Sequence, residues 1–350
     1  MKEKIALIFG GEGAERSISE ISAENLCRMI DGTVYDVMPI GISPSGDWYF
    51  YRGARENMSG GRWLTDTTNL HPTFPVKIGG RSGFLADGKA IPVACAIPCL
   101  HGDFGEDGTV QGALRAAHIS YVGQDVYASA MTSDKSYTKL VAEHLGIPTA
   151  KWTVLSEPDA RFALEEAKTK IFFPMFIKPA RLGSSIGAHP VSNSDSFIEA
   201  YNDAYSLGGR VLVEELIPIK YELECAMLNM GGETRIAPYG KITSGGAFYD
   251  YGAKYCGKGS VGVSADGDLE KEIASVAKDY AARLVDFIGI RDLGRIDFFV
   301  TDRGQVYFNE INVLPGMTES SLYPRLTEQM GLKTGEFINI LIEAARDRHI

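Results

Sequence analysis

Apolar runs and amphipathic segments alternate along the first third of the chain. Ile5 to Phe9 is uninterrupted and apolar, which predicts a buried strand, and Ser17 to about Ile30 has the spacing of an amphipathic helix. The glycine-rich segment 10–13 between them predicts a tight turn. Two more strands are predicted at Val34 to Ile42 and Val93 to Leu100. This order is typical of an open parallel α/β sheet, where ligands gather at the carboxyl ends of the strands.

The middle of the chain follows less regular patterns. Residues 44–90 are rich in Gly, Trp, Thr and Asn, which predicts an irregular excursion. Residues 101–109 form a predicted loop that caps a helix starting at Val110. Met131 to Leu145 is a further predicted helix, after which strands and helices alternate in the βαβ manner through residue 213.

The last part combines a Gly- and Tyr-rich loop (244–262), a helix (268–288), a hairpin and a final helix after Lys333. No internal repeat or low-complexity segment interrupts these patterns. These patterns predict a mixed α/β and α+β chain.

Composition and charge narrow the class of protein. Hydrophobic residues make up 45% and charged residues 23% of the 350 positions, which is ordinary for a globular protein of two or three domains. The net charge of −10 argues against a general nucleic-acid binder but allows a local phosphate-binding cleft. No apolar stretch approaches the ~18 residues that cross a membrane, and no signal peptide is expected. Five cysteines without metal-ligand spacing fit a reducing cytoplasm, and Cys95 and Cys99 are expected in the core.

The strongest local chemistry lies in the predicted hairpin. Residues 302–305 separate two strand-forming runs, so the two central residues are expected to form a two-residue loop. In that register Asp297 faces Glu310, and Arg295 faces Asn312. Side chains two apart on a strand share a face, so all four polar groups are expected on one side of the sheet.

Two opposed carboxylates on one face need an explanation. Asp297 and Glu310 repel each other unless something offsets their charge, and a hard cation such as Mg²⁺, which usually comes with phosphate, is the natural partner. The alternative is that they are solvated groups on an exposed face. The opposite face is predicted to be apolar, with Ile296, Phe298 and Ile311.

Two other segments suggest a nucleotide. A predicted strand ends in Lys178, and the following Gly183-Ser184-Ser185 offers backbone N–H groups and hydroxyls to a polyphosphate. Taken alone, however, this segment is better explained as a plain hairpin turn. The segment lacks the ending of a P-loop. The apolar strand 211–217 ends in Glu214 and Glu215 and can present its edge to adenine, or can be an ordinary strand end.

In this order, the lysine, the glycine–serine loop, the acidic strand and the late Asp/Glu/Asn hairpin resemble the ATP-grasp superfamily. Motifs spread from about residue 4 to 345 further resemble the D-alanine–D-alanine ligase family. They are Gly10-Gly11 through Ala14-Glu15-Arg16-Ser17-Ile18-Ser19, Leu100-His101-Gly102 through Gly112, Lys178-Pro179 with Gly183-Ser184-Ser185, Tyr249-Asp250-Tyr251 with Lys254-Tyr255, and Pro315-Gly316-Met317-Thr318 with Ser321-Leu322.

The resemblance implies an ATP-grasp fold behind an N-terminal open parallel-sheet domain, and a division into three domains, at residues 1–130, 131–213 and 214–350. It implies that ATP drives the joining of two D-alanines through an acyl phosphate, for peptidoglycan precursor synthesis. ATP is expected between the last two domains, and the dipeptide where all three meet. Mg²⁺ is the implied metal, as two ions that Mn²⁺ can replace, with Asp297, Glu310 and Asn312 as ligands.

The resemblance also implies a set of nucleotide-binding residues. Lys135 and Lys178 match phosphate-contacting lysines, Lys254 matches one that reaches the γ-phosphate, and Glu214 and Glu222 match acids that hold adenine and ribose. Because residues 218–221 are one residue longer than usual, Glu224 is the alternative to Glu222. The full implied set is Lys135, Lys178, Ser185, Glu214, Glu215, Leu216, Ile217, Glu222 and Lys254.

For the amino-acid substrates, the resemblance implies that Glu15 binds the first D-alanine's ammonium, with His101 near the same subsite. Ser184 and Tyr255 match residues that hydrogen-bond with Glu15. From the residues alone, Glu15 reads as a charge at a helix N-terminus and Ser184 as a turn hydroxyl. The remaining implied residues are Arg295 and the Gly316 amide, which stabilise the tetrahedral intermediate, and Ser321 and Leu322 at the second D-alanine's subsite.

Some features leave alternatives open. Gly252 stands where the family usually has Glu, which predicts a looser closing loop. Tyr255 and Leu322 favour the alanine ligase over D-alanine–D-serine or D-alanine–D-lactate ligases of the glycopeptide-resistance type, although the stretch from Ile40 to Tyr49 is similar to the serine type.

Two other classes of protein fit less well. A regulator that has lost catalysis is disfavoured by the intact set of Arg295, Asp297, Glu310 and Asn312. A dinucleotide oxidoreductase is disfavoured because Gly10-Gly11-x-Gly13 does not satisfy GxGxxG. The expected partners are small molecules, D-alanine and ATP, without nucleic acid or membrane, in a cytoplasmic homodimer.

Overall fold

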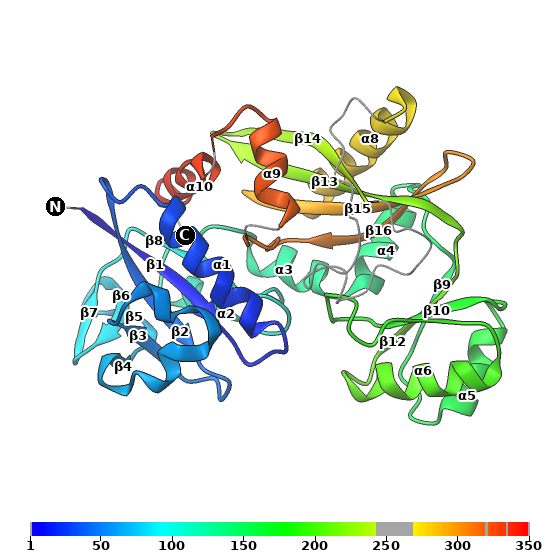
Figure 1. The fold of residues 1–350 in the computed structure, drawn as a ribbon, viewed down its shortest axis with the longest axis horizontal. Helices are drawn as coiled ribbons and strands as arrows, with labels where there is room; N and C mark the ends of the chain where they lie inside the picture. Colours follow the sequence, from blue (N-terminus) through cyan, green and yellow to red (C-terminus); the bar gives the residue numbers. More distant parts are fainter. Residues whose placement is uncertain (1, 243–268, 319–320, 334, 349–350) are drawn as a thin grey trace.

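The computed structural model describes residues 2–242, 269–318, 321–333 and 335–348. The chain forms an elongated molecule with the N-terminal part at one end, the green central part at the other, and the C-terminal sheet between them (Figure 1). Four sheets are present in the described part of the chain. The mixed α/β and α+β class predicted from the sequence is confirmed.

The N-terminal part is the expected open sheet. Its five strands lie in the order β4-β3-β2-β1-β8, and β1 runs parallel to both β2 and β8. Helix α1 packs on it and begins directly after the glycine turn, as predicted. The bounds are β1 (Glu3–Gly10), α1 (Arg16–Met29), β2 (Tyr35–Ile42) and β8 (Cys95–Pro98).

The segment 44–90 is more regular than the sequence suggested. Two of its strands, β3 (Trp48–Tyr51) and β4 (Leu70–Pro72), extend the first sheet through antiparallel pairing. Three more form a small sheet of their own: β5 (Pro75–Ile78), β6 (Arg81–Ala86) and β7 (Lys89–Ile91). The prediction of an irregular excursion was therefore wrong, because strands this short carry little periodic signal. Short 3₁₀ turns connect them: η1 (Arg55–Asn57), η2 (Ser59–Thr65) and η3 (Thr67–Asn69).

Trp63 anchors this segment to helix α1. The indole is fully buried, and its N–H donates to Glu20 at 3.0 Å. The backbone N–H of Gly61 donates to the other oxygen of the same carboxylate at 2.9 Å. The segment is thus tied to the helix that Glu15 directly precedes.

The single helix predicted from Met131 to Leu145 is replaced in the structure by two helices. Helix α2 (Thr109–Ala116) starts near Val110 as expected, but Met131 to Leu145 is broken between α3 (Val126–Ser133) and α4 (Lys135–His144). Asp134 takes an extended conformation, and its side chain accepts from the N–H of Ser136 at 2.9 Å. An aspartate that caps the next helix therefore interrupts the run, which the apolar spacing alone did not show. This break places Lys135 in the first turn of α4.

The central part is a four-stranded sheet in the order β11-β10-β12-β9, covered by two helices. The alternation of strands and helices is confirmed, but β12 lies between β9 and β10 and is antiparallel to both. The elements are β9 (Trp152–Leu155), α5 (Ala160–Lys168), β10 (Met175–Pro179), β11 (His189–Val191), α6 (Ser194–Ser206) and β12 (Val211–Glu215).

The C-terminal sheet is antiparallel, in the order β14-β13-β15-β16. Helix α8 covers it, and the final helix α10 reaches back to the N-terminal sheet, where it contacts β8 and α1 (Figure 1). The elements are β13 (Ile219–Met230), β14 (Glu233–Ile242), α8 (Lys271–Ile288), β15 (Leu293–Thr301), β16 (Val306–Asn312), α9 (Leu322–Gln329) and α10 (Glu336–Arg346).

The hairpin register is confirmed at the site but not at the turn. Asp297 pairs with Glu310 and Arg295 with Asn312, as predicted. The turn, however, has three residues, because the N–H of Thr301 bonds to the carbonyl of Gln305, and Gly304 takes a left-handed φ of 75°. A bulge at Asn309 then adds one residue to the second strand and restores the predicted pairs.

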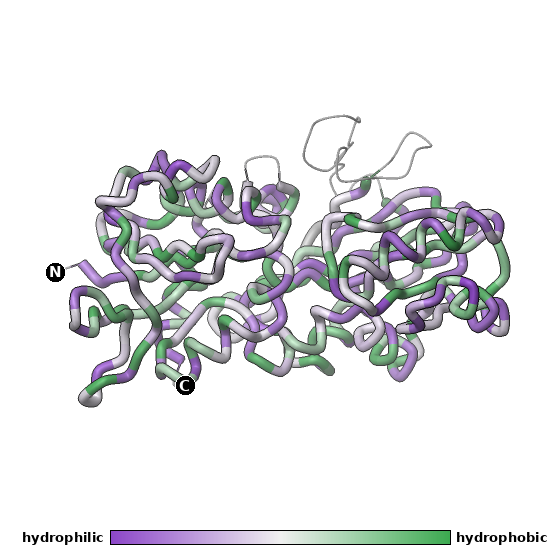
Figure 2. The backbone as a smooth tube through the Cα atoms, turned by 90° about the horizontal axis from the view of Figure 1, so that it is seen from below, coloured by the Kyte–Doolittle hydropathy of each residue, from purple (hydrophilic) through white to green (hydrophobic). Residues whose placement is uncertain are grey.

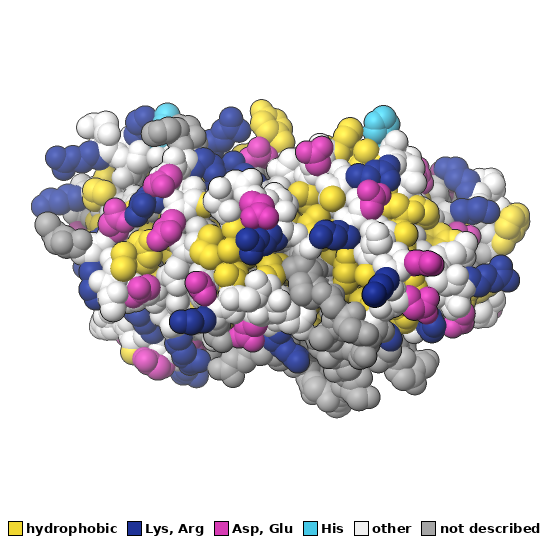
Figure 3. Space-filling view, turned by 90° about the horizontal axis from the view of Figure 1, so that it is seen from above, with side chains coloured by type: hydrophobic (Ala, Val, Ile, Leu, Met, Phe, Trp, Pro, Cys, Tyr) yellow, Lys and Arg dark blue, Asp and Glu magenta, His cyan; other side chains and the backbone are white. Residues whose placement is uncertain are grey.

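The core follows these sheets. Ile296, Phe298 and Ile311 are buried in one cluster with α8, which confirms the predicted apolar face, and Cys95 and Cys99 are buried as expected. Figure 2 shows hydrophobic and hydrophilic stretches alternating along the whole length of the chain. Figure 3 shows Lys and Arg interspersed with Asp and Glu over the upper face rather than one continuous charged surface.

Candidate active site

Two adjoining cavities lie along the polar face of β13, β15 and β16. One is lined by the central sheet, including Lys178 and Glu214, and also by Glu310. The other is lined by residues of all three parts of the molecule, among them Glu15, Ser184 and Arg295, and again by Glu310. Glu310 therefore stands at the junction of the two cavities. The first is called the nucleotide-side cavity below, because it is lined by residues expected from the sequence to bind a nucleotide, and the second is enclosed by all three parts of the molecule.

Three carboxylates cross the polar face of the C-terminal sheet in one row. Glu224 on β13 is paired with Asp297 on β15, and Asp297 is paired with Glu310 on β16. Arg295 compensates part of this charge: Nε lies 2.8 Å and Nη2 2.7 Å from the two oxygens of Asp297. The same Nε lies 3.3 Å from Glu224. The side chains predicted from the hairpin are therefore brought together, with Glu224 as an additional member.

The electrostatics of this row favour a charged guanidinium. Burial opposes the charge of Arg295, but the carboxylates of Asp297 and Glu224 outweigh it and raise the pKa of Arg295 above its usual range. Asn312 donates to Asp297 at 3.0 Å, and Lys135 lies 3.4 Å from Glu310. Every carboxylate of the row thus faces a cation or an amide.

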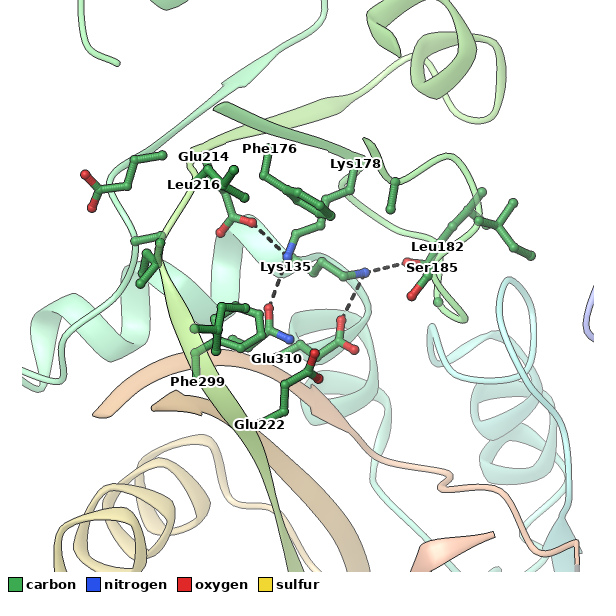
Figure 4. Close-up of a pocket in the computed structure, with 18 residues that line it drawn as sticks. Lys135, Phe176, Lys178, Leu182, Ser185, Glu214, Leu216, Glu222, Phe299 and Glu310 are labelled. Carbon is green, nitrogen blue, oxygen red and sulfur yellow. Dashed lines mark hydrogen bonds and ion pairs between the residues drawn. The ribbon is translucent and has the colours of Figure 1, made fainter. Parts of the chain in front are cut away.

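Lysines from two elements meet in the nucleotide-side cavity. Lys135 comes from the first turn of α4 and donates to the carbonyl of Leu182 in the glycine–serine loop. Lys178 at the end of β10 lies between Glu214, at 2.8 Å, and Asn309, at 3.1 Å (Figure 4). The bulge at Asn309 turns that side chain toward Lys178.

Glu214 holds a second lysine that the sequence reading missed. Lys139 lies 2.5 Å from the other oxygen of Glu214. Burial alone would raise the pKa of Glu214, but Lys139 and Lys178 lower it to about 2. Burial in turn lowers the pKa of Lys139, and the carboxylate opposes that effect. The spacing of Lys135 and Lys139, one helical turn apart, was the available signal.

The edge of the expected adenine strand is partly used by the protein itself. The backbone N–H of Glu215 donates to the carbonyl of Lys151 at 2.8 Å, and that of Leu216 to Pro174 at 3.1 Å. The Glu215 carboxylate accepts from the N–H of Lys151 at 2.9 Å. Ile217 also lines the cavity, and within the described residues its N–H has no hydrogen-bond acceptor.

Glu222 and Glu224 separate into different cavities. Glu222 lines the nucleotide-side cavity opposite Phe299, its pairing partner on β15, whereas Glu224 lies with Arg295 in the other cavity. The placement supports Glu222 as the nucleotide-binding acid of the two.

Glu15 and Ser184 meet although 169 residues separate them in the sequence. The hydroxyl of Ser184 donates to the buried carboxylate of Glu15, which makes no capping bond to its own helix. Ser184 and Ser185 both take left-handed φ values, of 53° and 57°, which residues other than glycine rarely adopt. The loop is thus held in an unusual conformation that directs one hydroxyl to Glu15.

His101 lines the same cavity. Burial lowers its pKa, with Glu15 opposing, so the ring is neutral at pH 7. Within the described residues Nε2 of His101 has no hydrogen-bond partner. A buried ring nitrogen next to Glu15 is available to a bound polar substrate.

The loop before α9 closes the far side of this cavity. Gly316, Ser321 and Leu322 all line it. A Cβ at Gly316 would lie 2.9 Å from Oγ of Ser321, so a side chain at this position would displace that hydroxyl. Helix α1 holds the next residue: Asn25 donates to the carbonyl of Met317 at 2.7 Å, and the N–H of Met317 donates to Ser22 at 3.2 Å.

Glu106 is a second residue that lines the site and to which the sequence analysis assigned no chemical role. Its side chain accepts from the N–H of Gly102 at 2.9 Å and lines the cavity with Glu15. Burial, with a smaller contribution from Glu15, raises the pKa of Glu106 to about 8. The carboxyl is therefore largely protonated at neutral pH.

This protonation predicts a pH-dependent effect of Glu106→Gln. The folded protein keeps the proton up to about pH 8, whereas the ordinary pKa is 4.5, so raising the pH between these values destabilises the wild type. Glutamine cannot ionise, so the free energy of unfolding of the variant, relative to that of the wild type, should rise by roughly 3–4 kcal/mol from pH 5 to pH 8. Denaturant unfolding at both pH values checks this. The exposed control Glu56→Gln should show no such trend, and an equal difference at both pH values would contradict the account.

Lys254, Tyr255 and Gly252 lie outside the described residues, so their predicted places in the site are not described. The other predicted residues line one of the two cavities or, for Asp297, lie directly beside them. Lys135, Lys178, Ser185 and Glu214 to Ile217 line the first. Glu15, His101, Ser184, Arg295, Gly316, Ser321 and Leu322 line the second, with Asn312.

The donor set suits Mg²⁺. Asp297 and Glu310 are opposed across two strands on the cleft face, and Asn312 adds an amide oxygen. Within the described ranges, no group of three or more His, Cys, Asp or Glu side chains forms a metal site of its own. One or two carboxylates completed by substrate phosphates is the usual arrangement for Mg²⁺, so the residues fit that ion.

A nucleotide-sized cavity between two four-stranded sheets, with lysines on one side and a carboxylate hairpin on the other, defines an ATP-grasp ligase. Family models agree: residues 4–124 match "D-ala D-ala ligase N-terminus" and residues 141–343 match "D-ala D-ala ligase C-terminus". The chain belongs to the D-alanine–D-alanine ligase family.

Individual relatives span the whole chain. A D-alanine–D-alanine ligase of Ruminiclostridium cellulolyticum is 36% identical over 99% of this chain and 96% of that protein. A D-alanine–D-alanine ligase of Oceanobacillus iheyensis is 34% identical over 100% of this chain and 96% of that protein. One similar solved structure is the VanG D-Ala:D-Ser ligase from Enterococcus faecalis, with a TM-score of 0.86 and 32% identity over 98% of this chain and 99% of that chain. Another is the D-alanine–D-alanine ligase from Coxiella burnetii, with a TM-score of 0.83 and 28% identity over 99% of this chain and 95% of that chain.

No helix among the residues that the structure describes is long and apolar enough to cross a membrane.

Proposed function

We propose that the protein joins two D-alanines to D-alanyl-D-alanine, using ATP and an acyl-phosphate intermediate, for peptidoglycan precursor synthesis. The observation that carries the proposal is Glu310 at the junction of the two cavities. One cavity has the lysines and apolar walls for a nucleotide, and the other has Glu15 and Arg295 for amino acids. A phosphoryl group can therefore pass from one to the other at the carboxylate hairpin.

The residues divide the work of binding. Lys135 and Lys178 neutralise nucleotide phosphates, and Glu222 and the N–H of Ile217 hold ribose and base. Phe176 and Phe299 supply apolar walls for the base. Mg²⁺ held by Asp297, Glu310 and Asn312 would neutralise phosphate charge and help align the transferred group; we propose two ions, with Mn²⁺ able to replace them.

On the amino-acid side, the Glu15 carboxylate receives the ammonium of the first D-alanine, and Ser184 fixes that carboxylate by its hydrogen bond. Arg295 lies on the hairpin beside Glu310 and Asn312, where charge develops on the oxygen of the tetrahedral intermediate. Ser321 and Leu322 form the subsite for the second D-alanine, and the N–H of Gly316 supports the same oxygen.

The experiment is a ligation assay. Purified protein is given Mg²⁺-ATP with D-alanine alone, and then with D-alanine plus D-serine or D-lactate, while phosphate release is followed and products are identified by mass. Turnover with D-alanine alone, giving the alanyl dipeptide, is expected. Products mainly from a mixed pair would instead make this a ligase of the resistance type, the alternative that Tyr255 and Leu322 disfavour.

Tyr255→Phe tests the closing loop. If Tyr255 completes the hydrogen-bonded group with Glu15 and Ser184, the variant should bind ATP nearly as well as the wild type but change turnover or selectivity for the acceptor. ATP affinity and kcat/KM for D-alanine, D-serine and D-lactate are measured side by side. Unchanged kinetics with every acceptor would remove Tyr255 from the mechanism.

We further propose the division into domains 1–130, 131–213 and 214–350, and a cytoplasmic homodimer. Cys27, Cys95, Cys99 and Cys225 are free thiols, which supports a reducing compartment. The domain division is supported by the separate sheets, although α4, at the start of the second domain, packs on β16 of the third.

A further inference from the structure

Three formal charges lie under the nucleotide-side cavity with almost no access to solvent. The side chain of Lys139 is 1% exposed, that of Glu214 5%, and that of Lys178 10%. The two lysines take one oxygen each of the single carboxylate, at 2.5 Å and 2.8 Å. Desolvating three charges is costly, so the arrangement needs a reason beyond stability.

The two lysines do not face the same way. Lys178 lines the cavity and also contacts Asn309, next to the metal-binding Glu310 (Figure 4). Lys139 does not line the cavity and lies behind Glu214. Of these two lysines, Lys178 is therefore the one that is in a position to touch a nucleotide. Lys139 can act on the nucleotide through the carboxylate that the two lysines share.

The charge balance shows what Lys139 contributes. With all three groups ionised, the cluster carries one net positive charge, and that charge faces the cavity through Lys178. If Lys139 were neutral, Glu214 and Lys178 would form an isolated pair with no net charge. A nucleotide phosphate would then have to compete with Glu214 for Lys178, at distances where such interactions are strong in a dry site.

We propose that Lys139 is a positioning residue whose ammonium neutralises Glu214, so that Lys178 keeps an uncompensated positive charge for the nucleotide phosphates. The inference rests on the proposed ATP-dependent function. Helix α4 delivers this charge one turn after Lys135, which pairs with Glu310, so a single helix balances one acid on each side of the cavity.

The test separates charge from structure by using two ligands. Calorimetry gives the dissociation constant of a non-hydrolysable ATP analogue with Mg²⁺, and displacement gives that of adenosine. Lys139→Met should weaken the analogue on the order of 10- to 100-fold but change adenosine by no more than about threefold. A collapse of the cavity would weaken both ligands equally, and that result would overturn the proposal, as would unchanged binding of the analogue.

The double variant Lys139→Met with Glu214→Gln removes both partners and leaves Lys178 with its charge. Its affinity for the analogue, relative to adenosine, should return to within about tenfold of the wild type. A double variant no better than Lys139→Met would overturn the proposal. If Lys139→Met fails to fold, the double variant alone provides the test. It must keep the ratio of affinities for the analogue and adenosine that the wild type shows, and loss of that ratio overturns the proposal.

The control is Lys168→Met, which breaks an exposed pair with Glu165 in the same part of the molecule and should leave both affinities unchanged. The outcomes also distinguish this inference from the proposed function. A wild type that binds no ATP analogue contradicts the function itself, whereas normal wild-type binding with an insensitive Lys139 contradicts only the role of Lys139.

Discussion

Replacing Glu310 by Gln should lower kcat/KM with Mg²⁺-ATP and D-alanine by about 100-fold or more. Glutamine keeps the shape of the side chain but removes the negative charge that faces Asp297 across the hairpin. In the proposed mechanism, the nucleotide phosphates would then lose the Mg²⁺ that this pair of carboxylates is proposed to hold. Initial rates at several Mg²⁺ concentrations measure the effect, and the variant should need more Mg²⁺ for half-maximal rate.

Glu233→Gln is the matched control. It lies on β14 of the same sheet, but it is exposed and forms an ion pair with the exposed Arg235. It should keep the wild-type rate and Mg²⁺ dependence. A Glu310→Gln enzyme that retains its full rate at low Mg²⁺ would contradict the assignment of the hairpin as the metal site.

Arg295→Lys should lower kcat on the order of 100- to 1,000-fold while changing the KM for ATP only a few-fold. The guanidinium makes two parallel contacts to Asp297 and a third to Glu224. A lysine keeps the charge but cannot reproduce this fork, so the charge would no longer be held at the place where we propose that the tetrahedral intermediate forms.

The control Arg235→Lys changes an exposed arginine of the same sheet and should leave kcat unchanged. Thermal unfolding of both variants identifies a loss caused by misfolding, because Arg295 is buried among carboxylates. A folded Arg295→Lys enzyme with wild-type kcat would remove Arg295 from the chemistry.

Most of the hairpin geometry could be predicted from the sequence. Alternation placed Arg295 and Asp297 on one face and Ile296 on the other, and the structure agrees. The turn was assigned one residue too few, and the bulge at Asn309 added one residue to the following strand, so the two differences cancel at the site. A bulge leaves no periodic signal of its own, and it also brings Asn309 to Lys178.

Glu15 and Ser184 illustrate the opposite case. Locally, each has an ordinary explanation, a charge near a helix start and a hydroxyl in a turn. Only the folded chain, or the resemblance to a family, brings together side chains 169 residues apart. Lys139 was missed although its spacing from Lys135 predicts a shared helix face, because nothing local identifies Glu214 as its partner.

The same limit explains the secondary-structure differences. Long, strongly patterned elements such as α1, β1 and α8 were predicted within a few residues. The strands of residues 44–90 are three to six residues long, and they are held by tertiary contacts such as Trp63 with Glu20 rather than by local preference. The break at Asp134 depends on a single capping side chain.

The most direct test of the central claim follows one oxygen atom. D-Alanine labelled with ¹⁸O at both carboxyl oxygens is incubated with the protein, Mg²⁺ and ATP, and the released phosphate is examined by mass. If ATP phosphorylates the carboxylate of the first D-alanine and the amine of the second displaces the phosphate, one ¹⁸O must appear in each phosphate formed with dipeptide. Dipeptide formation with unlabelled phosphate, or ATP hydrolysis that is independent of D-alanine, would contradict the account.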